Sequence, residues 1–244
     1  MNDTATPPLP PPLDREQGII AFNRRVLALA ESPNAPLLER LRYITIVSSN
    51  LDELFEIRVA ELKEIARSNT PLAASARASI ATLAVSAREL VERQYQVLRG
   101  DILPALEAEG VKVFFPAQWD DALRNWAYQV FMSEIEPLLT PIALDPAHPF
   151  PRISSKTLNF AVELDGRDAF GRRPGLAIVQ APRVLPIAFK VPPEVAGVPH
   201  GIVLLSSIIK GFMSELFPGL TVCTQCSFRL TRNSDLFVDE EEMT

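Results

Sequence analysis

The sequence predicts a multidomain chain, an N-terminal helical bundle followed by an α+β domain with an antiparallel sheet. Over roughly the first hundred residues, apolar side chains recur at the three- and four-residue spacing of helices. Residues 157–164 instead alternate apolar and polar side chains, as a half-buried strand does. At 244 residues the chain is long enough for one large or two modest domains.

Three segments divide the chain on these grounds. We expect a disordered Pro-rich tail at residues 1–13, a helical domain at 14–109 and an α+β domain at 110–244. The final residues have the composition of a first helical turn, so we expect Thr244 to be a truncation point.

Composition and charge limit the classes of function that the chain can have. A net charge of −6 argues against a general nucleic-acid binder. No apolar run approaches the roughly 20 residues of a membrane helix, and the N-terminus lacks the pattern of a signal peptide. Two cysteines provide no disulfide framework and suit a reducing cytoplasm. We therefore expect a cytoplasmic protein without a transmembrane segment.

Residues 14–31 should form the first helix, which Asp14 can cap. Two helices should follow, because Ser49-x-x-Asp52 and Asn50-x-x-Glu53 both read as capping boxes; the first would end near Val47. Residues 73–109 should form one long helix with a weak point near Gly100 or Pro104. The expected buried faces comprise Ile19, Phe22, Val26, Leu27 and Ala30; Leu37, Leu41, Ile44 and Val47; Leu51, Leu54, Phe55, Leu62 and Ile65; and Ala76, Ile80, Leu83, Ala87, Leu90, Val91, Tyr95 and Leu98.

Arg40 and Arg58 fall near the middle of the apolar stripe if each helical residue turns by about 100°. A buried guanidinium needs a carboxylate, a carbonyl or a ligand phosphate as its partner. An internal salt bridge or a snorkelling arginine is the structural alternative to ligand binding.

The second half of the chain mixes strands and helices. Trp119, Trp126 and Phe131 share one helical face, which favours a core role over a stacking platform. Prolines make residues 137–151 an irregular connection. The expected strands are 111–115, 157–164, 176–181, 187–191, 201–205, 220–230 and 236–238, and the expected helices are 116–139 and 206–217.

Few side chains in this half suggest chemistry. Arg229 and Arg232 should point to opposite faces of a strand, so that one could contact a ligand phosphate while the other is solvated, and nothing in the sequence selects between them. Cys223 and Cys226 form a lone CxxC whose sulfurs should also face opposite sides. His148 and His200 lie among prolines in expected loops, without the partners of a catalytic triad.

Several segments resemble one family in the same order. Residues 21–27, 36–41, 49–55 and 58–63 resemble the N-terminal domain of the type-1 polyphosphate kinases, and residues 145–151, 228–232 and 235–242 resemble landmarks of their head domain. Gly18-Ile19 departs from the Ser-Trp pair usual in the family, which puts one packing or substrate-side contact in doubt.

The resemblance implies an enzyme that reversibly transfers the terminal phosphate of ATP to inorganic polyphosphate with Mg²⁺. It implies that Asn50 contributes to ATP binding, and that the head domain supports dimer contacts. The phosphorylated histidine, the magnesium-linked arginines and most ATP contacts of such enzymes lie in later domains. We therefore expect this segment alone to be inactive, with no catalytic residue and no metal site of its own.

Other interpretations remain open at this stage. The chain could be a stand-alone, non-catalytic module that binds nucleotide, polyphosphate or a partner, and it could be regulatory. It could also be a structural scaffold in which Arg40 and Arg58 are buried. For Asn50, the alternative to ligand binding is a plain helix N-cap.

Overall fold

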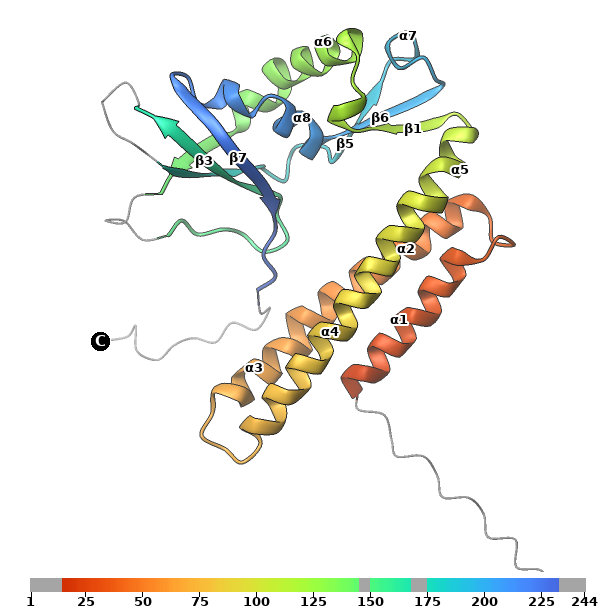
Figure 1. The fold of residues 1–244 in the computed structure, drawn as a ribbon, viewed down its shortest axis with the longest axis vertical. Coiled ribbons are helices and arrows are strands. Elements are labelled where there is room, and N and C mark those ends of the chain that lie inside the picture. Colours follow the sequence, from red (N-terminus) through yellow and green to blue (C-terminus); the bar gives the residue numbers. More distant parts are fainter. Residues whose placement is uncertain (1–14, 145–149, 168–174, 233–244) are drawn as a thin grey trace, which may run out of the picture. The chain divides into compact units, whose positions relative to one another are not determined.

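The structure, a computed structural model, describes residues 15–144, 150–167 and 175–232 (Figure 1). These residues divide into two compact units, residues 15–102 and residues 103–232. The units are a helical unit and a mixed unit, as the sequence predicts, whereas the domain limits at residues 109 and 110 stay a prediction. In the described part of the chain, no helix is both long and apolar enough to cross a membrane.

The helical unit consists of hairpin-connected helices. Its elements are α1 (Arg15–Glu31), α2 (Leu37–Glu53), the π-helical η1 (Leu54–Val59), α3 (Ala60–Arg67), α4 (Ala73–Val97) and the π-helical η2 (Leu98–Ile102). Within this unit α4 contacts both α1 and α3, and α1 contacts α2 (Figure 1). Their facing sides form its core, with Ile20, Leu27, Ala30, Val47, Leu54, Leu83 and Leu90 among the buried side chains.

The predicted helix break near Ser49 is wrong. The backbone stays helical from Leu37 to Arg67, and the amide of Leu54 donates to the carbonyls of Asn50 and Leu51. Asn50, one of the two expected caps, bonds to another helix instead, as does the nearby Ser48. Ser48 Oγ accepts a hydrogen bond from Gln94 Nε2 at 2.8 Å, and Asn50 Nδ2 donates one to Asn23 Oδ1 at 2.9 Å.

Several side chains assigned to the buried faces are exposed, namely Phe22, Phe55, Ile65 and Tyr95. The π-helical η1 explains Ile65. A π turn holds more residues than an α turn, so the constant helical period loses register within η1. The predicted weak point near Gly100 is confirmed, because η2 replaces the α-helix at Leu98–Ile102.

The mixed unit contains two sheets. Its elements are α5 (Leu103–Ala108), β1 (Val111–Phe114), η3 (Pro116–Gln118), α6 (Asp121–Val130), η4 (Phe131–Ile135), η5 (Glu136–Leu138), β2 (Thr140–Ala143), β3 (Asn159–Gly166), β4 (Leu176–Gln180), β5 (Ala188–Val191), α7 (Pro193–Ala196), β6 (His200–Leu204), α8 (Leu205–Gly211), η6 (Met213–Leu216) and β7 (Leu220–Phe228).

One sheet is antiparallel throughout, in the order β2-β4-β3-β7, and confirms the predicted antiparallel sheet. The other has the order β1-β6-β5, with β1 parallel and β5 antiparallel to the central β6. Strand β2 was missed in the Pro-rich stretch. It is an edge strand, where Pro141 can be tolerated.

The core of the mixed unit joins both sheets to α6 and α8. The Phe212 ring centroid lies 5.5 Å from that of Phe131 and 6.0 Å from that of Trp119. Phe131 and Trp119 are thus core residues, as predicted. The helix predicted at residues 116–139 is interrupted, because Asp120 caps a new helix by accepting from the Leu123 amide at 2.8 Å.

Candidate functional site

A cavity of about 290 Å³ lies within the helical unit, between α1 and the junction of α2 with η1. Asn50 and Arg58, two of the residues singled out in the sequence, both line it. The remaining lining residues are Arg15, Ile19, Phe22, Asn23, Glu53, Leu54 and Ile57. Arg40 does not line this cavity.

A pair of amides joins the two sides of the cavity. Asn50 Nδ2 donates to Asn23 Oδ1 at 2.9 Å, and Asn23 Nδ2 donates to the Ile19 carbonyl oxygen at 3.0 Å. Asn23 is fully buried, with 0% of its surface exposed. The sequence reasoning missed Asn23, although an amide on the apolar face of α1, beside Ile20 and Val26, is a signal that could have found it.

Apolar side chains form the walls. Ile19 and Phe22 come from α1, and Leu54 and Ile57 come from η1. The prediction that Phe22 is buried is wrong, since 49% of it is exposed. Its partly open ring can contact a ligand, and apolar walls with a few polar groups are typical of small-molecule sites.

Charged side chains complete the lining. Arg58 Nη1 forms an ion pair with Glu61 Oε2 at 2.8 Å, one turn along the same helical segment. A guanidinium carries five N–H donors, so this ion pair leaves Arg58 with donors for a ligand anion. Arg15 adds a second positive charge to the lining, and Glu53 adds a negative one.

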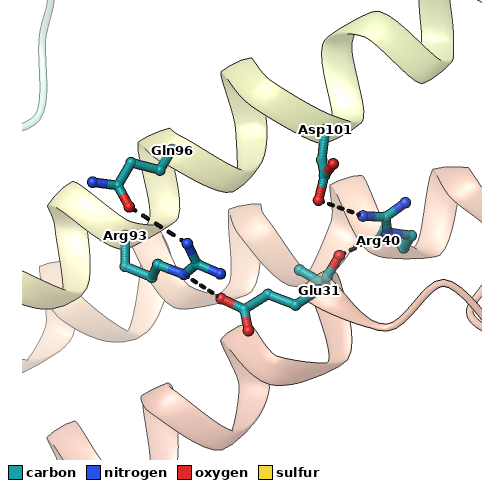
Figure 2. A network of polar contacts seen from close by, with 6 residues as sticks. Glu31, Arg40, Arg93, Gln96 and Asp101 are labelled. Carbon is teal, nitrogen blue, oxygen red and sulfur yellow. Dashed lines mark hydrogen bonds and ion pairs between the residues drawn. The ribbon is translucent and has the colours of Figure 1, made fainter.

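Arg40 has internal partners (Figure 2). Its Nε donates to the Ala30 carbonyl oxygen at 2.7 Å, and its Nη2 lies 3.5 Å from Asp101 Oδ2. Nearby, Arg93 Nε pairs with Glu31 Oε1 at 2.7 Å (Figure 2). Arg40 therefore has the internal partners that the structural alternative requires.

The N-cap interpretation of Asn50 rested on a helix start that does not exist. Asn50 lies inside the continuous helical stretch, three residues before the end of α2 at Glu53. Asn50 lines the cavity, and its side chain bonds there to Asn23, another lining residue.

Arg229 and Arg232 lie beyond β7, which ends at Phe228. The premise that they point to opposite faces of a strand is therefore wrong. Both are exposed, and the Arg232 amide donates to Ser155 Oγ at 3.2 Å. Neither is among the described residues that line the cavity of the helical unit.

The two cysteines do lie on β7, but the premise about their sulfurs fails. The pairing of β7 with β3 shifts register between Glu163 and Leu164, which leaves Cys223 as the extra residue of a β-bulge. The shifted alternation leaves Cys223 and Cys226 both exposed, as free thiols.

Neither histidine is among the described residues that line the cavity. His200 is the first residue of β6 and is exposed, so its expected loop position is wrong, while His148 lies outside the described residues. Across residues 15–144, 150–167 and 175–232, no group of three or more His, Cys, Asp or Glu side chains could hold a metal ion.

A second cavity, of about 310 Å³, lies in the mixed unit beside β2. Arg183 is its charged lining residue, and its Nη2 donates to the Ser155 carbonyl oxygen at 2.6 Å. Thr140, Ser154, Thr157 and Gln180 supply further polar groups. None of the site residues predicted from the sequence lines this cavity.

Comparisons with known proteins give a consistent picture. The family model described as "Polyphosphate kinase N-terminal domain" matches residues 13–114, and that described as "Polyphosphate kinase middle domain" matches residues 122–244. Among the curated relatives, the polyphosphate kinases of Paraburkholderia phytofirmans and Burkholderia vietnamiensis are 52% and 53% identical to the chain over 238 residues.

A solved structure is similar as well. The crystal structure of polyphosphate kinase from Porphyromonas gingivalis matches 93% of the chain with a TM-score of 0.81 and 26% identity. The chain spans 34% of that protein and 35% of each of the two curated relatives. By both family models and by these relatives, the chain belongs to the polyphosphate kinase family, of which it carries the N-terminal and middle domains.

Proposed function

We propose that this chain is the N-terminal part of an enzyme that reversibly transfers the terminal phosphate of ATP to inorganic polyphosphate. Membership of the family supports this proposal, as do relatives that are named polyphosphate kinases. The whole reaction belongs to the longer protein, because the chain spans about a third of those relatives.

We further propose that the cavity of the helical unit takes the base end of ATP. The carrying observation is that Asn50 lines a cavity with apolar walls, where its amide is held by a buried partner. A volume of about 290 Å³ lies at the lower end of the roughly 300–1,000 Å³ of ligand sites, so it suits the base and not the whole nucleotide. The phosphates would extend toward Arg58.

The later domains would supply the chemistry. The family resemblance implies that the phosphorylated histidine and the magnesium-linked arginines lie there, so these 244 residues alone should not turn over ATP. Mg²⁺ would accompany ATP, and no step is assigned to it on this chain. The head domain would contribute dimer contacts, and the enzyme would act in the cytoplasm; the family resemblance is the support for the dimer.

The test is to measure polyphosphate synthesis from ATP by the native protein, after its intact mass has been determined. Asn50→Ala should raise the KM for ATP while the thermal midpoint stays within a few degrees of wild type. An intact native mass of 27.0 kDa, with no synthesis, would favour the stand-alone binding module over the enzyme. An unchanged KM in the Asn50 variant would favour a scaffold role for the helical unit.

A further inference from the structure

We propose that Asn23 is a positioning residue that fixes the orientation of the Asn50 amide, and thereby makes the pocket select a 6-amino purine over a 6-oxo purine. This inference rests on the proposed function, since it concerns the base end of the nucleotide in the same cavity. It adds a residue to which the family resemblance assigned no role, and a specificity that the cavity alone does not dictate.

The orientation follows from a chain of hydrogen bonds that begins at the backbone. The Ile19 carbonyl oxygen can only accept, so the Asn23 atom 3.0 Å away must be Nδ2. Asn23 Oδ1 then faces Asn50, and the Asn50 atom 2.9 Å away must be Nδ2 as well. The assignment depends on the network alone, which is how amide orientations are decided.

The opposite orientation of the two side-chain amides, with oxygen and nitrogen exchanged, is unfavourable. If the Asn23 amide flipped, its oxygen would face the Ile19 carbonyl oxygen, and two acceptors would meet at 3.0 Å. Asn23 has 0% of its surface exposed, so water cannot compensate. The Asn50 amide is therefore held in one of its two orientations before any ligand arrives.

The bond to Asn23 determines which hydrogen-bonding groups of Asn50 are left for a ligand. One N–H of Nδ2 is used by Asn23, which leaves the second N–H and Oδ1 of Asn50 for the cavity. This donor and acceptor match the N7 acceptor and the N6 amino donor of adenine. A 6-oxo purine such as hypoxanthine presents two acceptors on that edge, so its O6 would face the Asn50 oxygen.

The structural alternative is that Asn23 is only a satisfied buried amide. Gln94 provides a matched control, because it is also a buried amide in the same unit and does not line the cavity. Gln94 Nε2 donates to the Ile44 carbonyl oxygen at 2.7 Å and to Ser48 Oγ at 2.8 Å. Removing either amide should destabilise the helical unit, but only the removal of the Asn23 amide should alter base selection.

The experiment uses the full native protein, and compares the KM for ATP with the inhibition constant of ITP measured against ATP. Wild type should bind ATP more tightly than ITP. Asn23→Ala should lower this preference by about 3- to 10-fold, the effect of roughly one hydrogen bond, mainly through a higher KM for ATP. Gln94→Ala should lower the thermal midpoint and leave the preference unchanged.

Asn23→Asp gives a partial rescue, because its carboxylate still accepts from Asn50 Nδ2 although it cannot donate to the Ile19 carbonyl. Its preference for ATP should exceed that of Asn23→Ala. If Asn23→Ala fails to fold, Asn23→Ser replaces it, since the shorter hydroxyl also leaves the Asn50 amide without its anchor.

Two outcomes overturn the proposal in different ways. Equal losses for ATP and ITP in the Asn23 variants, or no loss for either, would show that Asn23 is structural while the nucleotide pocket stands. If Asn50→Ala changes neither constant, the proposed pocket itself is wrong, and the role of Asn23 falls with it.

Discussion

Arg40 on α2 binds the last turn of α1, because its Nε donates a hydrogen bond to the Ala30 carbonyl oxygen at 2.7 Å. The last four carbonyls of a helix have no partner within the helix, and basic side chains commonly satisfy them. Only 13% of the Arg40 side chain is exposed, so this contact is shielded from water. The sequence could place Arg40 on the apolar stripe, but only the fold shows which carbonyl it meets.

Replacing Arg40 with methionine should destabilise the helical unit. The loss should be about 1.5–3 kcal/mol, the range for hydrogen bonds of charged groups. Urea unfolding would measure it, and Arg42→Met is the control. Arg42 is exposed, and its Nη1 lies 3.7 Å from Glu39 Oε1, so its replacement should change the free energy of unfolding by no more than about 0.5 kcal/mol. A raised KM for ATP in the Arg40 variant at unchanged stability would contradict a structural role.

Replacing Phe22 with serine should weaken ATP binding without unfolding the chain. The partly exposed ring forms a wall of the cavity, and stacking on a base contributes about 1–3 kcal/mol, which corresponds to at least a fivefold rise in KM. Leu29→Ser is a close control, because Leu29 is about equally exposed on the same helix and does not line the cavity. Equal effects of the two substitutions on KM would argue against the cavity as the base site.

Arg58 should bind phosphate in competition with Glu61. Arg58→Gln should raise the KM for ATP by about 3- to 10-fold, whereas Glu61→Gln, which removes the ion pair at 2.8 Å, should leave it unchanged or lower it. The control is Arg67→Gln, since Arg67 forms the same kind of pair with Glu64 at 3.1 Å and lies outside the cavity. Steady-state kinetics at two salt concentrations would test this, because screening should reduce the Arg58 effect.

Replacing Gly201 with alanine should destabilise the mixed unit. A Cβ there would lie 2.5 Å from the Ala196 Cβ and 3.1 Å from the Val191 Cβ, because β6 contacts α7 and pairs with β5 at this point. Overpacking of this kind costs about 1–3 kcal/mol. Gly100→Ala is the control, since its Cβ would meet nothing within 4 Å and alanine favours a helix. Thermal unfolding should show a lower midpoint for Gly201→Ala only.

The sequence allowed the order of elements to be predicted more fully than their contacts. Periodicity identified the long helices, and alternation identified β3, because both signals lie within one segment. The break predicted near Ser49 failed because Asn50, one of the two expected caps, bonds to Asn23, which is distant in sequence. A capping pattern cannot distinguish a cap from a side chain with a tertiary partner.

The residues of the candidate site were likewise predictable only in part. Asn50 could be predicted because a family motif surrounds it, and Arg58 because it interrupts an apolar stripe. Asn23 could not be assigned a role without its partners, and Phe22 was placed on the wrong side because helical spacing does not show where a helix face is left open. The prediction for Arg229 and Arg232 depended on where β7 ends, and strand ends are where predictions from sequence patterns are weakest.

The π-helical η1 also constrains how this gene segment can change in length. Deleting one codon within residues 54–59 would convert a π turn to an α turn, and because the α turn holds fewer residues, the helix from Ala60 onward would keep nearly the same rotation. The face of α3 that now contacts α4 would still point toward it, whereas a deletion within the α-helical residues of α2 would rotate that face by about 100°. Natural one-residue deletions in this stretch should therefore concentrate in residues 54–59 and at the turns around residues 32–36 and 68–72, where a change of length leaves the flanking helices in phase.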